Sequence, residues 1–241
     1  MSKLRAYLII DPLIVLATVV MGTLSTLASL FDPSGNRSHA IARLWSRILL
    51  LVGGMKVHVE GLEKVVPGAG YVIASNHLSL MDTPLVMAHI PLQFRFLAKR
   101  GLFKIPFIGG HLRRAGHVAI PREDARGSLK AMSEAARMIR ERSVSALVFP
   151  EGGRSTGVLQ EFKEGAAYIA IKAGVPIIPV AIGGTLQVLP MGSAVVRPGP
   201  VSLRLGDPIP TAGLSLPDRH RLTADIRARI LELMEDLNHY D

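Results

Sequence analysis

From Lys56 onward, short apolar runs alternate with segments of helical periodicity, and this alternation constrains the fold more than any other feature of the chain. Six runs have the composition of strands: KVHVE (56–60), YVIAS (71–75), FRFLA (94–98), HVAI (117–120), SALVF (145–149) and PIIPVAI (176–182). Several are apolar at nearly every position, as strands buried on both faces are. The alternation therefore predicts an α/β fold with a mainly parallel sheet flanked by helices.

Two further patterns complete the predicted domain. The segment 195–206 (VVRPGPVSLRLG) predicts two strands joined at a Pro-Gly turn. A C-terminal amphipathic helix is predicted from apolar residues at helical spacing, namely Leu222, Ile226, Ile230, Leu233 and Leu237. A chain of 241 residues is long enough for one sizeable α/β domain with its own core.

The 20 residues between Asp11 and Asp32 carry no charge and predict an apolar helix. At about 1.5 Å per residue this helix reaches about 30 Å, the thickness of a bilayer's hydrocarbon core. Hydroxyl side chains dilute its hydrophobicity, so that spanning is allowed but not required. The alternative is a cleaved signal peptide that begins at Lys3 and Arg5, although no convincing small-x-small cleavage site follows.

A second N-terminal helix is predicted over 39–52 (HAIARLWSRILLLV). Its apolar residues at helical spacing are Ile41, Leu44, Trp45, Ile48 and Leu49. This helix either lies in a membrane interface or packs on the protein's own core, and the pattern does not distinguish the two. Together the two segments predict a membrane-associated helical segment at 1–52, followed by a catalytic α/β domain at 53–241.

The net charge of +9 favours a polyanionic partner. Aromatic residues make up only 5% of the chain and do not interleave with basic stretches, so nucleic-acid binding is poorly supported. Basic residues such as Arg43 and Arg47 instead accompany apolar segments, which fits an anionic bilayer surface. The chain has no cysteine and therefore no cysteine nucleophile, and its eight histidines show no metal-ligand spacing.

The segment SNHLSLMDTP (75–84) follows the predicted strand YVIAS and places His77 five residues before Asp82. On one regular helix these side chains would point about 140° apart, so they meet only if the chain turns between them. Asp82-Thr83-Pro84 has the pattern of a helix start, which allows such a turn. Asp82 would then orient the imidazole and raise its basicity. The alternative is that Asp82 is a helix cap and His77 an ordinary loop histidine.

A His–Asp pair normally activates a nucleophile, and neither Ser75 nor Ser79 has the context of a nucleophile elbow. The nucleophile is therefore interpreted as a substrate hydroxyl that His77 deprotonates directly.

A second loop, LVFPEGGRS (147–155), also follows a predicted buried strand. Gly152 permits close approach of backbone to ligand, and the Arg154 guanidinium matches the oxygens of a phosphate. The alternative is a local ion pair between Glu151 and Arg154 within a turn. Farther along the predicted sheet, Lys99 follows one strand and Arg122 follows another, so that both can face the same carboxyl edge of the sheet. The apolar VPIIPVAI (175–182) either walls an acyl-chain groove or is buried core.

Four blocks, taken in order, resemble the motifs of the 1-acylglycerol-3-phosphate acyltransferase family, part of the wider glycerolipid acyltransferases. NHLSLMD (76–82) is similar to the first motif, Asn-His followed by four residues and Asp. The later blocks are KRGLFKIPFIGGHLRRAGHVAIPR (99–122), FPEGGRS (149–155) and VPIIPV (175–180). The resemblance covers residues 56–210, and its first and third motifs together are highly specific.

The resemblance implies a role for each site residue. His77 would be the general base and Asp82 its partner. Glu151 and Arg154 would bind the acceptor with Gly152, as would Lys99 and Arg122 from the second motif. Two positions depart from the family pattern: Gly153 stands where Thr is usual, and Gly101 where Glu often follows the basic pair. Both departures concern the acceptor and not the base.

The implied reaction moves a fatty acyl group from acyl-CoA or acyl-acyl-carrier-protein to 1-acylglycerol 3-phosphate, giving phosphatidic acid in phospholipid biosynthesis. No metal or other cofactor is implied, and the expected location is the cytoplasmic face of the cell membrane. Another acceptor, such as a lyso-aminolipid or glycerol 3-phosphate, is the first alternative. A non-catalytic membrane-binding protein of the same fold is the second.

Overall fold

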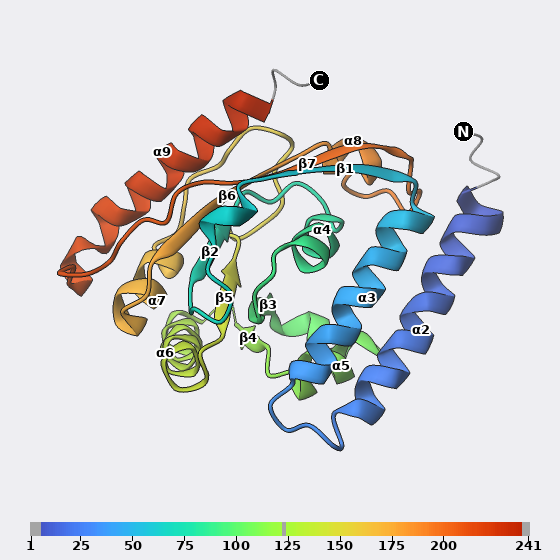
Figure 1. The fold of residues 1–241 in the computed structure, drawn as a ribbon, viewed down its shortest axis with the longest axis horizontal. Helices are drawn as coiled ribbons and strands as arrows, with labels where there is room; N and C mark the ends of the chain where they lie inside the picture. The colour runs from blue at the N-terminus through green and yellow to red at the C-terminus, as the bar shows by residue number, and fades with distance from the viewer. Residues whose placement is uncertain (1–5, 122–123, 238–241) are drawn as a thin grey trace.

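In the computed structural model, which describes residues 6–121 and 124–237, seven strands form one sheet in the order β1-β7-β6-β2-β5-β3-β4 (Figure 1). The strands are β1 (Met55–Glu60), β2 (Val72–Ser75), β3 (Phe94–Lys99), β4 (Val118–Ile120), β5 (Ser145–Val148), β6 (Ile177–Gly183) and β7 (Gly199–Leu205). Every pairing is parallel except that of β6 with β7. The predicted α/β fold with a mainly parallel sheet is confirmed.

The predicted pair of strands at 195–206 is wrong in its first half, because 190–198 form a loop and only β7 is a strand. Both edges of β7 are already paired, one with β1 and the other with β6, so a hairpin strand has no edge to join. The loop is instead fixed by the Arg197 N–H, which donates to the Val188 carbonyl at 2.8 Å. Val196 is buried in the core.

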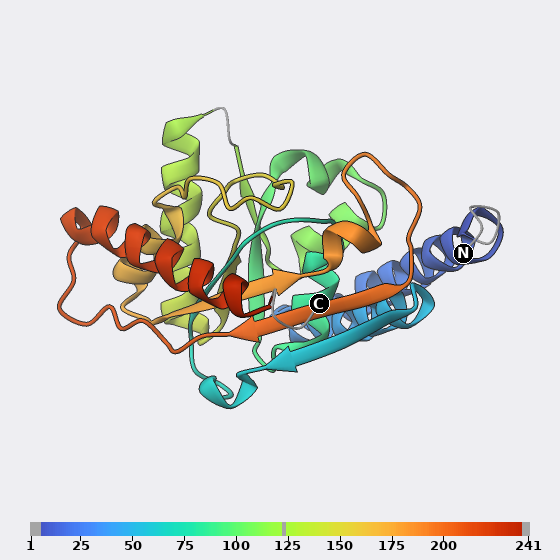
Figure 2. The same cartoon turned by 90° about the horizontal axis from the view of Figure 1, so that it is seen from above.

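Helices cover both faces of the sheet (Figures 1 and 2). They are α2 (Asp11–Ala28), α3 (Asn36–Val52), α4 (Asp82–His89), α5 (Ile108–Arg114), α6 (Ala125–Arg142), α7 (Gly165–Ala173), α8 (Thr185–Val188) and α9 (Arg219–Leu237). Alternate residues of β2 serve the two faces: Ile73 packs with α3 and α4, and Val72 packs with α6, α7 and α9. The predicted C-terminal helix is confirmed as α9.

The predicted apolar stripe of α3 does not coincide with its buried face. Leu44 is 51% exposed, whereas the buried positions include Ser38, Ala42 and Ser46. Small residues at these three positions allow α3 to approach its neighbours closely, and the remaining buried positions are His39, Leu49 and Leu50. Leu49 lies in the same core as the sheet, so this helix packs on the protein's own core, which was one of the two alternatives.

The N-terminal helix exposes many large apolar side chains. Residues 7–28 are helical, contain an 18-residue window with a mean hydropathy of 2.1, and are long and apolar enough to cross a membrane. Large apolar side chains point outward along its length, namely Leu13, Val15, Leu16, Val20, Leu24 and Leu27. That residues 1–52 attach the chain to a membrane stays a prediction.

Candidate active site

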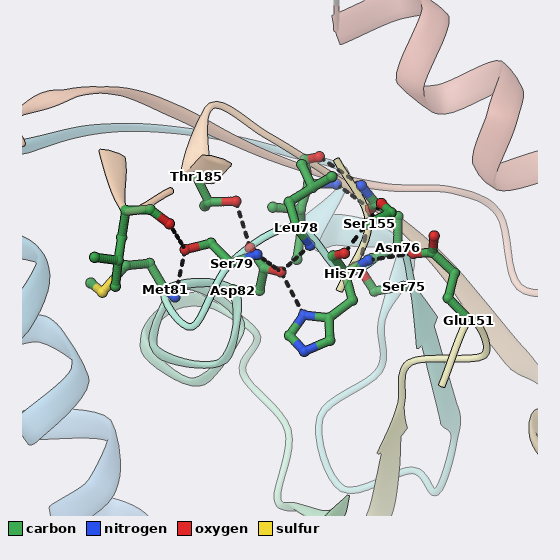
Figure 3. A network of polar contacts seen from close by, with 12 residues as sticks. Ser75, Asn76, His77, Leu78, Ser79, Met81, Asp82, Glu151, Ser155 and Thr185 are labelled. Atoms are coloured by element: carbon green, nitrogen blue, oxygen red, sulfur yellow. Dashed lines mark hydrogen bonds and ion pairs between the residues drawn. The ribbon is translucent and has the colours of Figure 1, made fainter. Parts of the chain in front are cut away.

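Three neighbouring strands end in loops that meet at one place on the sheet edge (Figure 3). His77 follows β2, Glu151 follows β5 and Thr185 follows β6, and these strands lie in the order β6-β2-β5. The carboxyl edge of a parallel sheet is where such folds place their ligand sites.

The turn after β2 brings His77 and Asp82 together. α4 begins at Asp82, and the imidazole Nδ1 lies 2.7 Å from Asp82 Oδ2. The same carboxylate oxygen accepts the main-chain N–H groups of Leu78 at 2.6 Å and Ser79 at 2.9 Å, so the aspartate also closes the loop. The Asp82 side chain is fully buried. Because a carboxylate can only accept, Nδ1 carries the proton, and Nε2 on the opposite side of the ring is free to act as a base.

The imidazole is held by packing as well as by Asp82. Its ring stacks on Phe149 with the ring centroids 4.0 Å apart and an interplanar angle of 16°. Only 17% of the side chain is exposed. A stacked ring with one nitrogen bonded has little rotational freedom, which is the preorganisation that general-base catalysis requires.

Thr185 completes the bonding of Asp82 and was missed by the sequence reasoning. Its hydroxyl donates to Asp82 Oδ1 at 2.5 Å, and the residue is fully buried. The preceding Gly184 has φ of +77°, and a Cβ there would lie 2.2 Å from the Pro200 carbonyl oxygen, so only glycine allows this turn. The position of Thr185 directly after a buried strand was the signal that could have found it.

Asn76 fixes the first loop to β6. Its side-chain amide donates to the Ile182 carbonyl at 2.9 Å and accepts the Ile182 N–H at 2.8 Å. This reciprocal pair ties the end of β2 to the end of β6. It therefore fixes the position of His77 relative to Thr185 along the strand direction.

The structure gives Glu151 partners other than the acceptor that the sequence reasoning expected. Its Oε1 accepts the His77 main-chain N–H at 2.7 Å, and its Oε2 accepts the Gln160 N–H at 3.0 Å. Only 9% of the residue is exposed. The Ser155 N–H in turn donates to the His77 carbonyl at 2.7 Å. Glu151 therefore ties the loop after β5 to the loop that carries the imidazole.

Arg154 is half-buried and has no hydrogen bond or ion pair among the described residues, so the alternative of an ion pair with Glu151 does not hold there. Lys99 is exposed at the end of β3 and lines the cavity described next. Arg122 lies outside the described residues. Gly152 has φ of +73°, and a Cβ there would lie 3.0 Å from Lys163 Nζ. The lack of a side chain at Gly152 therefore leaves room for Lys163, a cation that the sequence reasoning missed.

A cavity of about 930 Å³ opens beside His77. Its lining is mostly apolar and includes Trp45, Met87, Leu112 and Met132. A volume of this size lies within the range of ligand pockets, about 300–1,000 Å³. β6, which contains most of VPIIPVAI, does not contribute to this lining and is buried core.

Two buried histidines, His39 and His117, and the partly buried His111 lie where the N-terminal helices meet β3, β4 and α5. Burial lowers the pKa of His39 to about 3 and that of His111 to about 4. Burial also holds the pKa of His117 well below its ordinary value. The cation of Arg95 adds to each of these shifts. All three imidazoles are therefore neutral near pH 7, and among the described residues no three His, Asp or Glu side chains gather as metal ligands.

Comparison with known proteins gives one consistent group. Residues 56–183 match the family model described as Acyltransferase. A chloroplastic 1-acyl-sn-glycerol-3-phosphate acyltransferase of Arabidopsis thaliana is 32% identical over 86% of this chain and 57% of its own length. The alpha 1-acyl-sn-glycerol-3-phosphate acyltransferase of Homo sapiens is 30% identical over 82% of this chain and 70% of its own length.

The solved structures contain a similar fold. The crystal structure of the 1-acyl-sn-glycerophosphate (LPA) acyltransferase of Thermotoga maritima superposes with a TM-score of 0.82 at 28% sequence identity. The likeness covers 99% of this chain and 98% of that one. By contrast, the chain spans about half the length of the first plant relatives, 57% of the Arabidopsis protein and 50% of one from Brassica napus.

Proposed function

The chain belongs to the Acyltransferase family, and from this premise we propose that it transfers a fatty acyl group to the 2-hydroxyl of 1-acylglycerol 3-phosphate. The product is phosphatidic acid, made for phospholipid biosynthesis. The observation that carries this proposal is the buried Asp82 that holds Nδ1 of His77, 2.7 Å away, beside a large apolar cavity.

The geometry supports one direct transfer step. Nε2 of His77 takes the proton of the acceptor hydroxyl as that oxygen attacks the carbonyl carbon of the donor thioester. The imidazolium formed is stabilised by the Asp82 carboxylate. When the tetrahedral intermediate collapses, the C–S bond breaks and the leaving thiolate takes the proton from Nε2. The ester, the free thiol and the neutral imidazole are then in place for a new cycle.

The cavity suits the acyl chain, because its lining is apolar and continuous with His77. We assign the acceptor phosphate to two cations that line the cavity and to Arg154, which follows the cavity-lining Gly152 in the loop after β5. Arg154 supplies a planar fork for phosphate oxygens, while Lys163 and Lys99 supply point charges on the cavity wall. This assignment favours a phosphorylated acceptor over a lyso-aminolipid.

The donor is acyl-CoA or acyl-acyl-carrier-protein, and no metal or other cofactor takes part in the proposed step. We propose that the N-terminal helices hold the enzyme at the cytoplasmic face of the membrane. The exposed apolar side chains along α2 support this proposal, because they would otherwise face water.

An acceptor panel with the purified full-length chain tests the proposal. Thiol release is measured with each acyl donor and with 1-acylglycerol 3-phosphate, glycerol 3-phosphate or a lyso-aminolipid. We expect the highest rate with 1-acylglycerol 3-phosphate, and a loss of about 10²–10⁴-fold in a folded His77→Ala variant. Preference for a lyso-aminolipid would replace the acceptor, and no thiol release with any acceptor would indicate a binding protein.

A further inference from the structure

Three large apolar side chains stand exposed on the catalytic domain beside the N-terminal helix. Leu102 lies in the 3₁₀ turn Arg100–Lys104, Ile105 follows that turn, and Phe107 precedes α5. They are 39%, 41% and 44% exposed, respectively. Exposed apolar residues scattered singly are ordinary on proteins, but a cluster within six positions indicates a binding surface. We refer to residues 99–114 as the 99–114 surface.

The charge of the same surface is uniformly positive. It carries five exposed basic residues, Lys99, Arg100, Lys104, Arg113 and Arg114, and no acidic residue occurs between positions 99 and 114. Arg113 donates to the Phe103 carbonyl and Arg114 to the Ser29 hydroxyl at 3.3 Å, which fixes the base of the surface. Apolar side chains interleaved with basic ones are typical of segments that lie in an anionic membrane interface.

The 99–114 surface packs directly on α2. A Cβ on Gly22 would lie 2.9 Å from the Phe107 Cβ, and the Ser25 hydroxyl lies 2.8 Å from His111 Nδ1. Val15 precedes Gly22 by seven residues, about two helical turns, and so lies on the same ridge of α2. Val15 is 61% exposed. Between Val15 and Gly22 this side of α2 carries Thr18, whose hydroxyl donates to the Ile14 carbonyl at 2.7 Å, and Val19. The outward apolar surface of α2 therefore lies next to the 99–114 surface.

The cavity beside His77 reaches this place. Leu102 and Phe107 line the cavity although both are also exposed, and Met21 and Gly22 line it from the side of α2. The apolar lining is therefore continuous with the apolar exterior between α2 and the 3₁₀ turn Arg100–Lys104. A lipid leaving a bilayer at this point would meet apolar side chains along its path toward His77.

We infer that the 99–114 surface is a second membrane-inserting element, which seats the catalytic domain on an anionic leaflet beside α2. Leu102, Ile105 and Phe107 enter the acyl boundary, and the five cations meet anionic headgroups. The lipid acceptor then passes between the leaflet and the cavity between α2 and the 3₁₀ turn. This inference rests on the proposed membrane attachment through α2.

The chain has no cysteine, so a single introduced cysteine can be labelled specifically with an environment-sensitive fluorophore. The test position is Ile105→Cys, whose side chain does not line the cavity among the described residues. Val15→Cys reports on α2. Leu231→Cys on α9, at 39% exposure, is the matched control on the other side of the sheet (Figure 1). Each labelled protein is mixed with vesicles of phosphatidylcholine, with or without phosphatidylglycerol.

We expect emission at 105 and 15 to rise and shift to the blue with phosphatidylglycerol vesicles, and emission at 231 to stay unchanged. A response at 15 without one at 105 would overturn the inference and leave attachment through α2 intact. No response at either position would refute the attachment itself. A response at 105 that depends on protein concentration and needs no vesicle would assign the surface to a second copy of the chain, and would also overturn the inference.

A functional arm uses Ile105→Asp. We expect several-fold lower activity on acceptor embedded in vesicles and unchanged activity on a short-chain acceptor dispersed below its micellar concentration. If Ile105→Asp keeps the same fraction of wild-type activity on both acceptors, the 99–114 surface does not act at the membrane.

Discussion

The main-chain N–H of His77 donates to the Glu151 carboxylate at 2.7 Å, across 74 residues of sequence. His77, the proposed base, is therefore positioned from two sides, by Asp82 through its ring and by Glu151 through its backbone. This arrangement makes Glu151 a positioning residue, although it sits in a loop that otherwise presents Arg154 as a candidate ligand for phosphate.

Glu151→Gln should mainly lower kcat. The amide keeps one acceptor oxygen but turns its NH₂ group toward either the His77 or the Gln160 N–H, so one charge-assisted bond of about 1.5–3 kcal/mol is lost. If the loss is expressed in the transition state, kcat falls roughly 10–150-fold with little change in the acceptor KM. Gln160→Ala keeps its main-chain N–H and is the matched control. A raised acceptor KM with unchanged kcat would show that Glu151 contacts the acceptor.

The bonds to Asp82 predict an order of effects on kcat. His77→Ala removes the base, Asp82→Asn keeps the base but removes its charged partner, and Thr185→Val removes only one of the hydrogen bonds to the carboxylate. We expect the losses to decrease in that order, with Thr185→Val costing about tenfold, the lower end of the roughly 1.5–3 kcal/mol of a hydrogen bond to a charged group. Thr156→Val, at an exposed position, is the control. A silent Asp82→Asn variant would reduce Asp82 to a loop-closing residue.

Arg154→Lys should weaken the use of a phosphorylated acceptor even though the charge is kept. A bidentate guanidinium contact is lost, which corresponds to about 1.5–3 kcal/mol or roughly 10–150-fold in kcat/KM. The same variant should lose much less activity on monoacylglycerol, which has no phosphate to hold. Steady-state kinetics on both acceptors make the comparison, with Arg197→Lys as the control at an exposed site. Equal losses on both acceptors would assign Arg154 to support of the loop.

Stability should fall as the pH drops below about 6.5, the ordinary histidine pKa of an unfolded chain. The folded-state pKa values of His39 and His111 are about 3 and 4, so between these values and 6.5 the unfolded state binds more protons. Their contribution is complete above that range and is lost on acidification, by about 1 kcal/mol for each histidine at pH 5.5. Urea unfolding at several pH values measures this. His39→Gln should show a shallower pH dependence, and an unchanged one would contradict the burial argument.

The parts that sequence predicted well are those in which a local pattern has a local consequence. Apolar runs located the strands, and the short spacing of His77 and Asp82 allowed their contact to be inferred from one turn. Thr185 was missed because its contact with Asp82 spans 103 residues and exists only once β6 lies beside β2. The predicted apolar stripe of α3 matched the buried face only in part: Leu49 is buried, but periodicity counts large apolar side chains and so missed Ser38 and Ala42, which close packing between helices selected.

The pairing of β1 with β7 has a consequence for the synthesis of the chain. Translation produces Met55–Glu60 early, but the strand beside it, Gly199–Leu205, is made only after every other strand. The ribosome has therefore released His77, Glu151 and Thr185 before the sheet edge can close. The apolar α2 is made before any strand. Under the proposed attachment through α2, a nascent chain therefore reaches the bilayer before the site around His77 is assembled.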